Sequence, residues 1–359
     1  MPKTLVIAEA GVNHNGDEAL ARELIKVASN AGADVVKFQT FKAESLATSR
    51  APKANYQKKN DEKIGSQVEM LRKLELDHDC FFRLSEFCKK NNIQFMSTAF
   101  DLLSADFLVD KINQDILKIP SGEIINEPYL LGHARLKKKL ILSTGMATLA
   151  EIESALGVIA FGLQGSKGTE PGRDSFLSAY ISTEGQELLK RHVSLLHCTT
   201  EYPTPYEDVN LKCITTLASS FGLPIGFSDH TDGISAPIAA VALGATIIEK
   251  HFTLDKTLQG PDHSASLEPT DLESMVSGIR HIEMALGNGV KMPTSTELTN
   301  RVPVRQSIVA IEDIEAGEYF SEKNIGTRRP GSGMHPALYW DVIGKKARCD
   351  FNKFDEITL

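Results

Sequence analysis

The sequence predicts a (β/α)8 barrel, the TIM-barrel fold, followed by a small C-terminal domain. Eight short apolar and β-branched segments recur up to about residue 286, and helix-like periodicity fills most of the intervals between them. Polar side chains follow these segments, at the strand ends where barrel enzymes place their chemistry. A doubly wound parallel sheet is the alternative arrangement. The predicted strands are residues 4–8, 34–38, 94–97, 115–119, 140–143, 193–198, 223–228 and 246–252.

The interval after the first predicted strand shows how the predicted helices are built. Asp17 is a suitable N-cap, Leu20, Leu24 and Val27 share one face, and Gly32 can end the helix. The other intervals resemble it, except that residues 164–185 are rich in glycine, serine and charge. We interpret that stretch as a surface insertion between the fifth and sixth strands, with no role assigned.

Domain boundaries follow from where the alternation stops. We predict a barrel over residues 1–286, a linker over 287–301 and a small domain over 302–359. The linker contains Asn288-Gly289 and Pro293, which interrupt regular structure, and the last segment has short strand-like runs separated by glycine-containing turns.

Composition excludes several classes of protein. The chain has 359 residues, of which 42% are hydrophobic, enough for a sizeable core. Its net charge of −8 disfavours nucleic acid and anionic membranes as partners. The apolar run at the N-terminus is too short for a signal peptide, and no membrane span is evident. Five scattered cysteines without a C-x-x-C pair favour a cytoplasmic protein without a disulfide framework.

Two histidines mark the candidate active site. His230 and His251 stand at the downstream ends of consecutive predicted strands, and parallel strands joined by a helix end on the same side of a sheet. Two neutral imidazoles leave several coordination positions to water and substrate, which suits octahedral Mn²⁺ or Mg²⁺ better than structural zinc. Asp229, Asp255 and His263 are further candidate neighbours of the ion.

Lys118 is the candidate anion-binding residue. It lies in an otherwise apolar strand and should point into the barrel mouth, where an unpaired ammonium would be costly and a phosphate would pair it. The remaining polar residues at predicted strand ends are Glu9, Lys37, Gln39, Thr98, Ser121, Glu123, Ser143, Thr200, Tyr202 and Ser228.

Several ordered sequence blocks, spread over nearly the whole chain, resemble the sialic acid synthases. The blocks are AEAGVNHNG at 8–16, VKFQ at 36–39, KIPSGE at 118–123, STGM at 143–146, HCTTEYP at 197–203, SDH at 228–230, EKHF at 249–252, GPD at 260–262 and RPG at 329–331. The resemblance implies condensation of phosphoenolpyruvate with an N-acetylated hexose, with C–O cleavage that releases phosphate. It also implies that the tail is an antifreeze-like (SAF, β-clip) domain and that the protein is a domain-swapped homodimer.

The resemblance assigns roles to individual residues. It implies that His230 and His251 hold the metal, with Mn²⁺ favoured over Mg²⁺ or Co²⁺. It implies that Glu9 and Glu123 are catalytic carboxylates, with Glu123 stabilising the cationic C2 or orienting water, and Glu9, with Gln39, contacting the sugar or a metal-bound water. The phosphoenolpyruvate contacts that it implies are Lys37, Thr98, Lys118, Ser121, Ser143 and Ser228, with Thr200 where the family often has asparagine. The sugar contacts that it implies are Gln39, Tyr202, Asp262 and, from the partner subunit, Arg329.

Alternative functions stay open at this point. The hexose is expected to be one such as N-acetylmannosamine, giving N-acetylneuraminate. The alternative is a 2,4-diacetamido-trideoxyhexose, giving legionaminate or pseudaminate. Barrels that use phosphorylated aldoses would need a second basic phosphate site, which we do not find. A non-catalytic sugar-binding barrel would not need Lys118, Glu123 and both histidines at one mouth.

Overall fold

The computed structural model describes residues 3–48, 66–165 and 168–359. The chain divides into two compact units, Met1–Gly287 and Asn288–Leu359. In the second unit, α15 (Ser295–Thr299) and α16 (Arg301–Val304) lie in and beside the segment predicted as a linker. Among the described residues, no helix is both long and apolar enough to cross a membrane.

The first unit is the predicted (β/α)8 barrel. Its eight strands are all parallel and hydrogen-bonded in the order β3-β2-β1-β8-β7-β6-β5-β4. The strands are β1 (Leu5–Gly11), β2 (Val35–Thr40), β3 (Gln94–Ala99), β4 (Ile116–Ile119), β5 (Lys139–Ser143), β6 (Val193–Cys198), β7 (Ile225–Asp229) and β8 (Ile247–His251).

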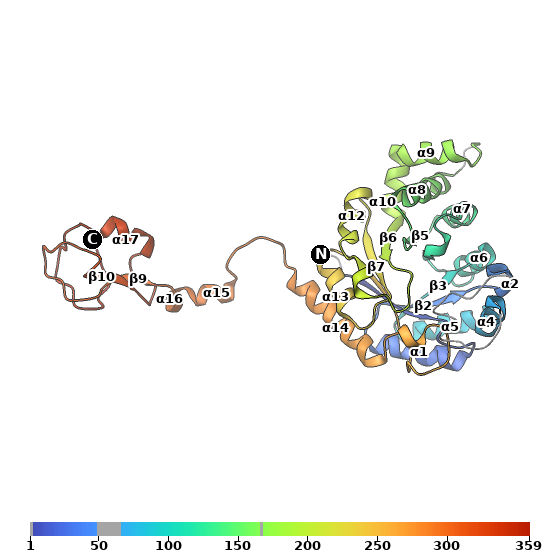
Figure 1. Cartoon of the computed structure of the whole chain (residues 1–359), viewed down its shortest axis with the longest axis horizontal. Helices are drawn as coiled ribbons and strands as arrows, with labels where there is room; N and C mark the ends of the chain where they lie inside the picture. The colour runs from blue at the N-terminus through green and yellow to red at the C-terminus, as the bar shows by residue number, and fades with distance from the viewer. Residues whose placement is uncertain (1–2, 49–65, 166–167) are drawn as a thin grey trace. The chain divides into compact units, whose positions relative to one another are not determined.

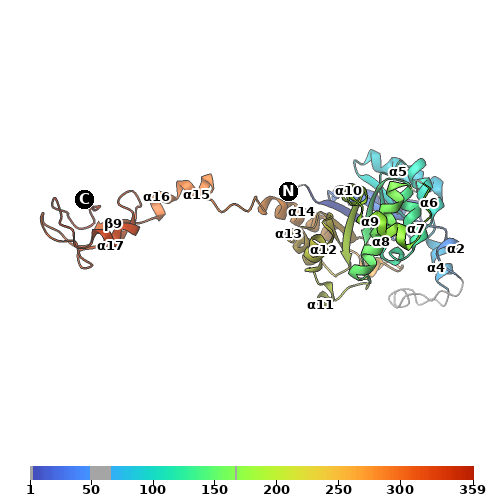
Figure 2. The same ribbon diagram turned by 90° about the horizontal axis from the view of Figure 1, so that it is seen from above.

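Helices form the layer outside the strands (Figure 1), as the view from above also shows (Figure 2). Side chains such as Asp17, Asp77 and Thr148 accept hydrogen bonds from the first turns of their helices. The helices are α1 (Glu18–Asn30), α2 (Ala43–Leu46), α4 (Gln67–Leu74), α5 (His78–Lys90), α6 (Leu102–Asp110), α7 (Glu127–Arg135), α8 (Leu149–Gln164), α9 (Arg173–Ile181), α10 (Thr183–His192), α11 (Tyr206–Val209), α12 (Cys213–Phe221), α13 (Ser235–Ala242) and α14 (Pro269–Ala285).

The predicted surface insertion is helical and packs on the barrel. It contains α9 and the start of α10, and Phe176 of α9 is buried with its ring 5.3 Å from that of Phe161 of α8. Gly157 of α8 lies where an added Cβ would be 3.1 Å from the Phe176 carbonyl oxygen, so the glycine permits close helix packing.

The interior of the barrel has an apolar layer beneath a polar one. Side chains of a strand alternate between its two faces, so every second residue points inward. The inward apolar cluster is Ile7, Val35, Met96, Ile141, Leu196 and Ile247. The residues two positions further along the same six strands are Glu9, Lys37, Thr98, Ser143, Cys198 and Glu249. The same alternation therefore builds the core and delivers polar side chains to the barrel mouth.

The Gln114 side chain joins β3 and β4, the first and last strands of the hydrogen-bonded order. Among the described strands, β3 and β4 are neighbours without a backbone ladder. The buried Gln114 carboxamide lies between them: its Oε1 accepts from Ser97 N at 2.8 Å, and its Nε2 donates to Ser97 O at 2.9 Å and Ile116 O at 2.8 Å. One glutamine thus satisfies backbone groups that a strand would otherwise pair.

The second unit has its own small core. Strand β9 (Ser307–Ala310) pairs antiparallel with β10 (Ile325–Arg328), and η3 (Pro336–Leu338) leads into α17 (Tyr339–Val342). Its buried apolar residues are Ile308, Ala310, Ile314, Phe320, Ile325, Val342, Ala347, Phe351 and Ile357.

We predict that Gln114→Ala destabilises the barrel, because Ser97 N and two carbonyl oxygens would lose their partners inside the protein. The free energy of unfolding in urea should fall by about 1–3 kcal/mol. Gln94→Ala is the matched control, since Gln94 lies on the exposed start of β3. Equal stability of the two variants would show that Gln114 does not hold the barrel closed.

Candidate functional site

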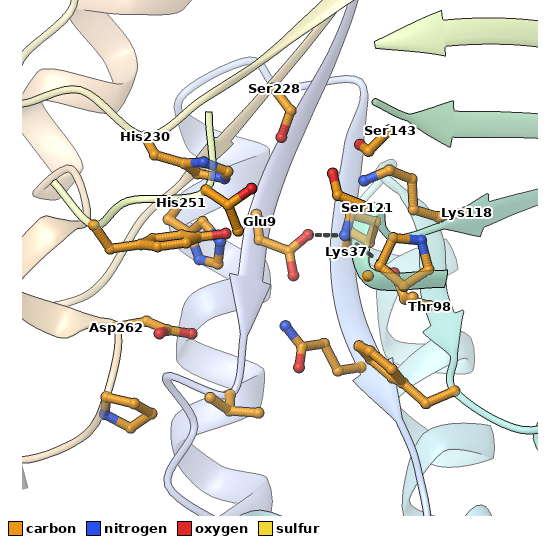
Figure 3. Close-up of a pocket in the computed structure, with 18 of the residues that line it drawn as sticks. Glu9, Lys37, Thr98, Lys118, Ser121, Ser143, Ser228, His230, His251 and Asp262 are labelled. Carbon is orange, nitrogen blue, oxygen red and sulfur yellow. Dashed lines mark hydrogen bonds and ion pairs between the residues drawn. The ribbon is translucent and has the colours of Figure 1, made fainter. Parts of the chain in front are cut away.

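A cavity of about 410 Å³ opens at the carboxyl ends of the barrel strands. Figure 3 shows His230, His251 and Asp262 on one side, Lys118, Ser121 and Ser143 on the other, and Glu9 between them. The sequence-predicted residues that line it are Glu9, Lys37, Gln39, Thr98, Lys118, Ser121, Ser143, Thr200, Tyr202, Ser228, His230, His251 and Asp262.

Glu123 is not among the residues lining this cavity, and Arg329 belongs to the second unit. Glu123 belongs to η1 (Ser121–Glu123), is half-buried, and accepts a hydrogen bond from Asn126 Nδ2 at 2.6 Å. Arg329 is exposed and follows β10 in the second unit. The candidate metal neighbours Asp229, Asp255 and His263 do not line the cavity either.

A buried ionic network forms the floor of the cavity. Lys118 Nζ lies 2.8 Å from Glu249 Oε1, and Lys37 Nζ lies 3.5 Å from Glu249 Oε2 and also pairs with Glu9. None of the four side chains is more than 7% exposed. The register of the sheet sets this proximity, because Glu9 pairs with Lys37 across β1 and β2.

We did not predict Glu249 as a site residue from the sequence, although it changes the interpretation of Lys118. It neutralises the ammonium that we expected a phosphate alone to pair, and it also accepts a hydrogen bond from Ser228 Oγ at 3.0 Å. A signal existed: Glu249 precedes His251 by two positions in an apolar strand, so both point the same way.

The two carboxylates of the network differ in acidity. Burial raises the pKa of Glu9 to about 7; the charge of Lys37 opposes this shift and that of Glu249 adds to it. Burial also acts on Glu249, but the charges of Lys118 and Lys37 outweigh it and hold the pKa of this carboxyl well below its usual range. Glu9 is therefore the group here that can exchange a proton near neutral pH, while Glu249 stays ionised.

The two histidines lie next to each other on one side of the cavity and suit a metal ion. Their ring centroids are 5.8 Å apart, and His230 Nδ1 lies 2.6 Å from the Thr199 carbonyl oxygen, so this nitrogen carries the proton and Nε2 is left to accept. Burial lowers the pKa of His230 to about 4 and that of His251 well below its usual value, so both rings are neutral. Buried His251 Nδ1 has no hydrogen-bond partner among the described residues.

The protein offers few ligands beyond these two rings. The described residues contain no group of three or more His, Cys, Asp or Glu side chains arranged to hold a metal. Asp229 instead pairs with Lys250 at 2.6 Å, both fully buried outside the cavity. An ion held by His230 and His251 would take its other ligands from water or substrate, as catalytic metals do.

Gly11 keeps space open beside His251 and Glu9. Its φ is +53°, and an added Cβ would lie 3.2 Å from Glu9 Oε1, 3.4 Å from His251 Cε1 and 3.5 Å from Gln39 Nε2. A residue with a side chain would be strained there, would crowd the Glu9 carboxylate, and would contact the other two groups.

The opposite side of the cavity can bind an anion. Ser121 Oγ accepts a hydrogen bond from Gly145 N at 2.9 Å and lies 3.0 Å from Cys198 Sγ, and the buried Ser143 hydroxyl has no hydrogen-bond partner among the described residues. A Cβ at Gly145 would lie 2.6 Å from Thr200 Oγ1 and 2.8 Å from Ser121 Oγ, so the glycine allows these loops to meet. Hydroxyl donors and two ammonium groups converge here.

Comparison with known proteins agrees with this geometry. A model of the NeuB family matches residues 24–291, and a model of the SAF domain matches residues 305–353. The N,N'-diacetyllegionaminic acid synthase of Campylobacter jejuni is 48% identical over 357 residues, covering 99% of both chains. The enzyme of that name from Legionella pneumophila is 45% identical over 341 residues, covering 95% of this chain and 89% of the relative.

A solved structure supports the fold assignment. The crystal structure of N-acetylneuraminic acid (sialic acid) synthetase from Leptospira borgpetersenii, in complex with citrate, superposes with a TM-score of 0.68 at 35% identity. The match covers 83% of this chain and 90% of that one. The predicted barrel, SAF domain and family resemblance are thus confirmed, and the chain belongs to the NeuB family of nonulosonic acid synthases.

Proposed function

We propose that this phosphoenolpyruvate-dependent nonulosonic acid synthase uses a 2,4-diacetamido-trideoxyhexose and forms N,N'-diacetyllegionaminate. The observation that carries this choice is the 48% identity, over 99% of both chains, to a relative named for that product. N-Acetylmannosamine, our first expectation from the sequence, has less support than this alternative.

The cationic side of the cavity suits phosphoenolpyruvate. We propose that its phosphate and carboxylate pair with Lys118 and Lys37 and accept hydrogen bonds from the Ser143 and Ser121 hydroxyls. Both lysines already have carboxylate partners, so the substrate meets positive groups held in fixed positions. Binding then needs little rearrangement of the site.

The histidine side suits the sugar aldehyde. NeuB-family enzymes typically use a divalent metal, and we propose that His230 and His251 hold it. When bound, the ion supplies Lewis-acid polarisation of the aldehyde. Buried Asp262, whose pKa burial raises to about 6, stands on the same side and can hydrogen-bond a sugar hydroxyl.

Glu9 lies between the two substrates and is suited to move a proton. We propose that C3 of phosphoenolpyruvate forms the new C–C bond to the aldehyde carbon while protonated Glu9 gives its proton to the aldehyde oxygen. Water then adds to C2 and returns a proton to Glu9. The bond between C2 and the phosphate ester oxygen breaks, the new C2 hydroxyl gives its proton to the departing phosphate, and a ketone is left. Glu249, which stays ionised, offsets the positive charge that develops on C2. The half-buried position of Glu123 gives less support to the role expected for it.

A homodimer is proposed from the family resemblance alone. In it, Arg329 would serve the sugar site of the partner subunit, and a dimeric mass in sedimentation equilibrium is the expected result.

We predict that the purified protein condenses phosphoenolpyruvate with 2,4-diacetamido-2,4,6-trideoxymannose faster than with N-acetylmannosamine. With ¹⁸O in the bridging C–O–P position, mass spectrometry should find the label in phosphate, because the C–O bond breaks. Product from N-acetylmannosamine alone would contradict the sugar assignment, and label in the nonulosonate would contradict the mechanism.

We predict that chelation abolishes turnover and that Mn²⁺ restores it. His230→Ala should lose stoichiometric metal in elemental analysis, and added Mn²⁺ should not rescue it at concentrations that saturate the native enzyme, because half of the protein ligands are gone. His281→Ala, on the exposed side of α14, is the control and should keep its metal. Full turnover in excess chelator would exclude the metal site.

We predict that Gly145→Ala weakens the phosphoenolpyruvate site, because its Cβ would push apart Ser121 and Thr200. The kcat/KM for phosphoenolpyruvate should fall about 10- to 100-fold, as expected for a misplaced binding group. Gly172→Ala is the control: an added Cβ there would find its nearest neighbour 4.0 Å away. Equal kinetics of both variants would show that these loops do not bind phosphoenolpyruvate.

A further inference from the structure

One side of the cavity is apolar and comes from the helices that follow β2. Met70, Leu71 and Leu74 of α4, Leu46 of α2, and Phe100 after β3 line it together, and we call these five residues the apolar wall. The three α4 residues are each at most 9% exposed. None of the five was singled out from the sequence, and the three in α4 have the spacing of an ordinary amphipathic helix.

The apolar wall is held against the barrel. Its residues pack with Val12 after β1 and with Phe41, whose ring meets that of Phe100 edge-on at 6.2 Å. Glu75, directly after α4, pairs with Lys42 at 2.7 Å and accepts from Ala43 N at 3.0 Å, which ties α4 to α2.

A glycine sets the distance between α4 and the barrel. An added Cβ at Gly16 would lie 2.4 Å from the Lys73 carbonyl oxygen, so only glycine permits this approach. The wall is therefore a built part of the cavity.

The sugar must lie along this wall if the proposed function holds. In the proposed function, phosphoenolpyruvate binds on the side with Lys118 and Ser143 and the aldehyde lies between it and His251; Figure 3 shows these residues on opposite sides of the cavity. The carbons beyond the aldehyde then extend toward the remaining lining, of which the apolar wall is a large part.

The wall distinguishes the candidate sugars by what they carry at C4 and C6. N-Acetylmannosamine has hydroxyls at both carbons, and a hydroxyl buried against methionine and leucine loses its hydrogen bonds to water. The 2,4-diacetamido-trideoxyhexose has a methyl group at C6 and an acetamido group at C4. Gln39 and Gln67 are the two carboxamides among the described lining residues, and they can bond the amide while its methyl packs on the wall.

We propose that the apolar wall determines specificity by accepting the 4-acetamido and 6-deoxy half of the hexose. This inference rests on the proposed function. It assigns sugar selection to α2 and α4, away from the residues that carry out the chemistry.

The test compares two substitutions at Met70. Met70→Gln keeps length but adds a polar end, and Met70→Leu keeps the site apolar. The ratio of kcat/KM for 2,4-diacetamido-2,4,6-trideoxymannose over N-acetylmannosamine should be about 10- to 100-fold in the native enzyme and about 10-fold smaller in Met70→Gln. Met70→Leu should preserve the ratio, and the KM for phosphoenolpyruvate should be unchanged in both variants. Met284→Gln is the matched control, because Met284 is 74% exposed on α14.

The outcomes separate this inference from the proposed function. A native preference for the diacetamido sugar that Met70→Gln leaves unchanged overturns the role of the wall, while the proposed function stands. A native preference for N-acetylmannosamine, or no turnover of either sugar, overturns both.

A second measurement applies if circular dichroism shows Met70→Gln to be misfolded. The native enzyme is then compared on the diacetamido sugar with and without a 6-hydroxyl. The wall predicts that the hydroxyl lowers kcat/KM about 10-fold or more, and equal values overturn it.

Discussion

The ionic network of Lys37, Lys118, Glu9 and Glu249 is the constraint on which the site depends. Burying four ionisable groups inside a barrel is costly unless each charge has a partner at close range. The partners come from β1, β2, β4 and β8, so the network exists only when the barrel is closed. The network also sets the chemistry: burial raises the pKa of Glu9 to about 7 although Lys37 pairs with it, whereas Glu249 has both lysines as partners and stays ionised.

The barrel supports this network by dividing its interior into layers. Beneath the charges, apolar side chains such as Ile7, Met96 and Ile247 exclude water and fill the barrel interior. Above them, His230, His251 and Ser143 at the end of β5 line the cavity. A single strand such as β8 contributes Ile247 to the apolar layer, Glu249 to the network and His251 to the cavity lining, each two residues apart. The same strands thus supply residues for stability and residues for function, which restricts substitutions at every inward position.

The sequence motifs predicted the polar residues at the strand ends but did not predict their ion-pair partners. His230, His251 and Lys118 stood out because polar residues ended or interrupted apolar runs, and the cavity collects all three. Glu249 also interrupts an apolar strand, but we could not assign it a role, because the sequence does not indicate which lysine or arginine a carboxylate in a strand will pair with. Glu123 shows the opposite case: it follows the strand that bears Lys118, yet a short 3-10 turn directs it to Asn126. Met70 and Gln114 gave no signal, because one lies on an ordinary apolar helix face and the other looks like a polar loop residue.

The sequence by itself determined the barrel, the small second domain and the set of strand-end residues, because hydrophobic periodicity and strand polarity are local properties of the chain. The tertiary structure decided which charges pair, which carboxyl can exchange a proton near neutral pH, and which helices form the wall of the cavity. Those features depend on burial and on distances between residues such as Lys118 and Glu249, which are 131 positions apart in the chain and 2.8 Å apart in the fold. Electrostatic energy depends on separation and local dielectric, and neither is set until the strands close into a barrel.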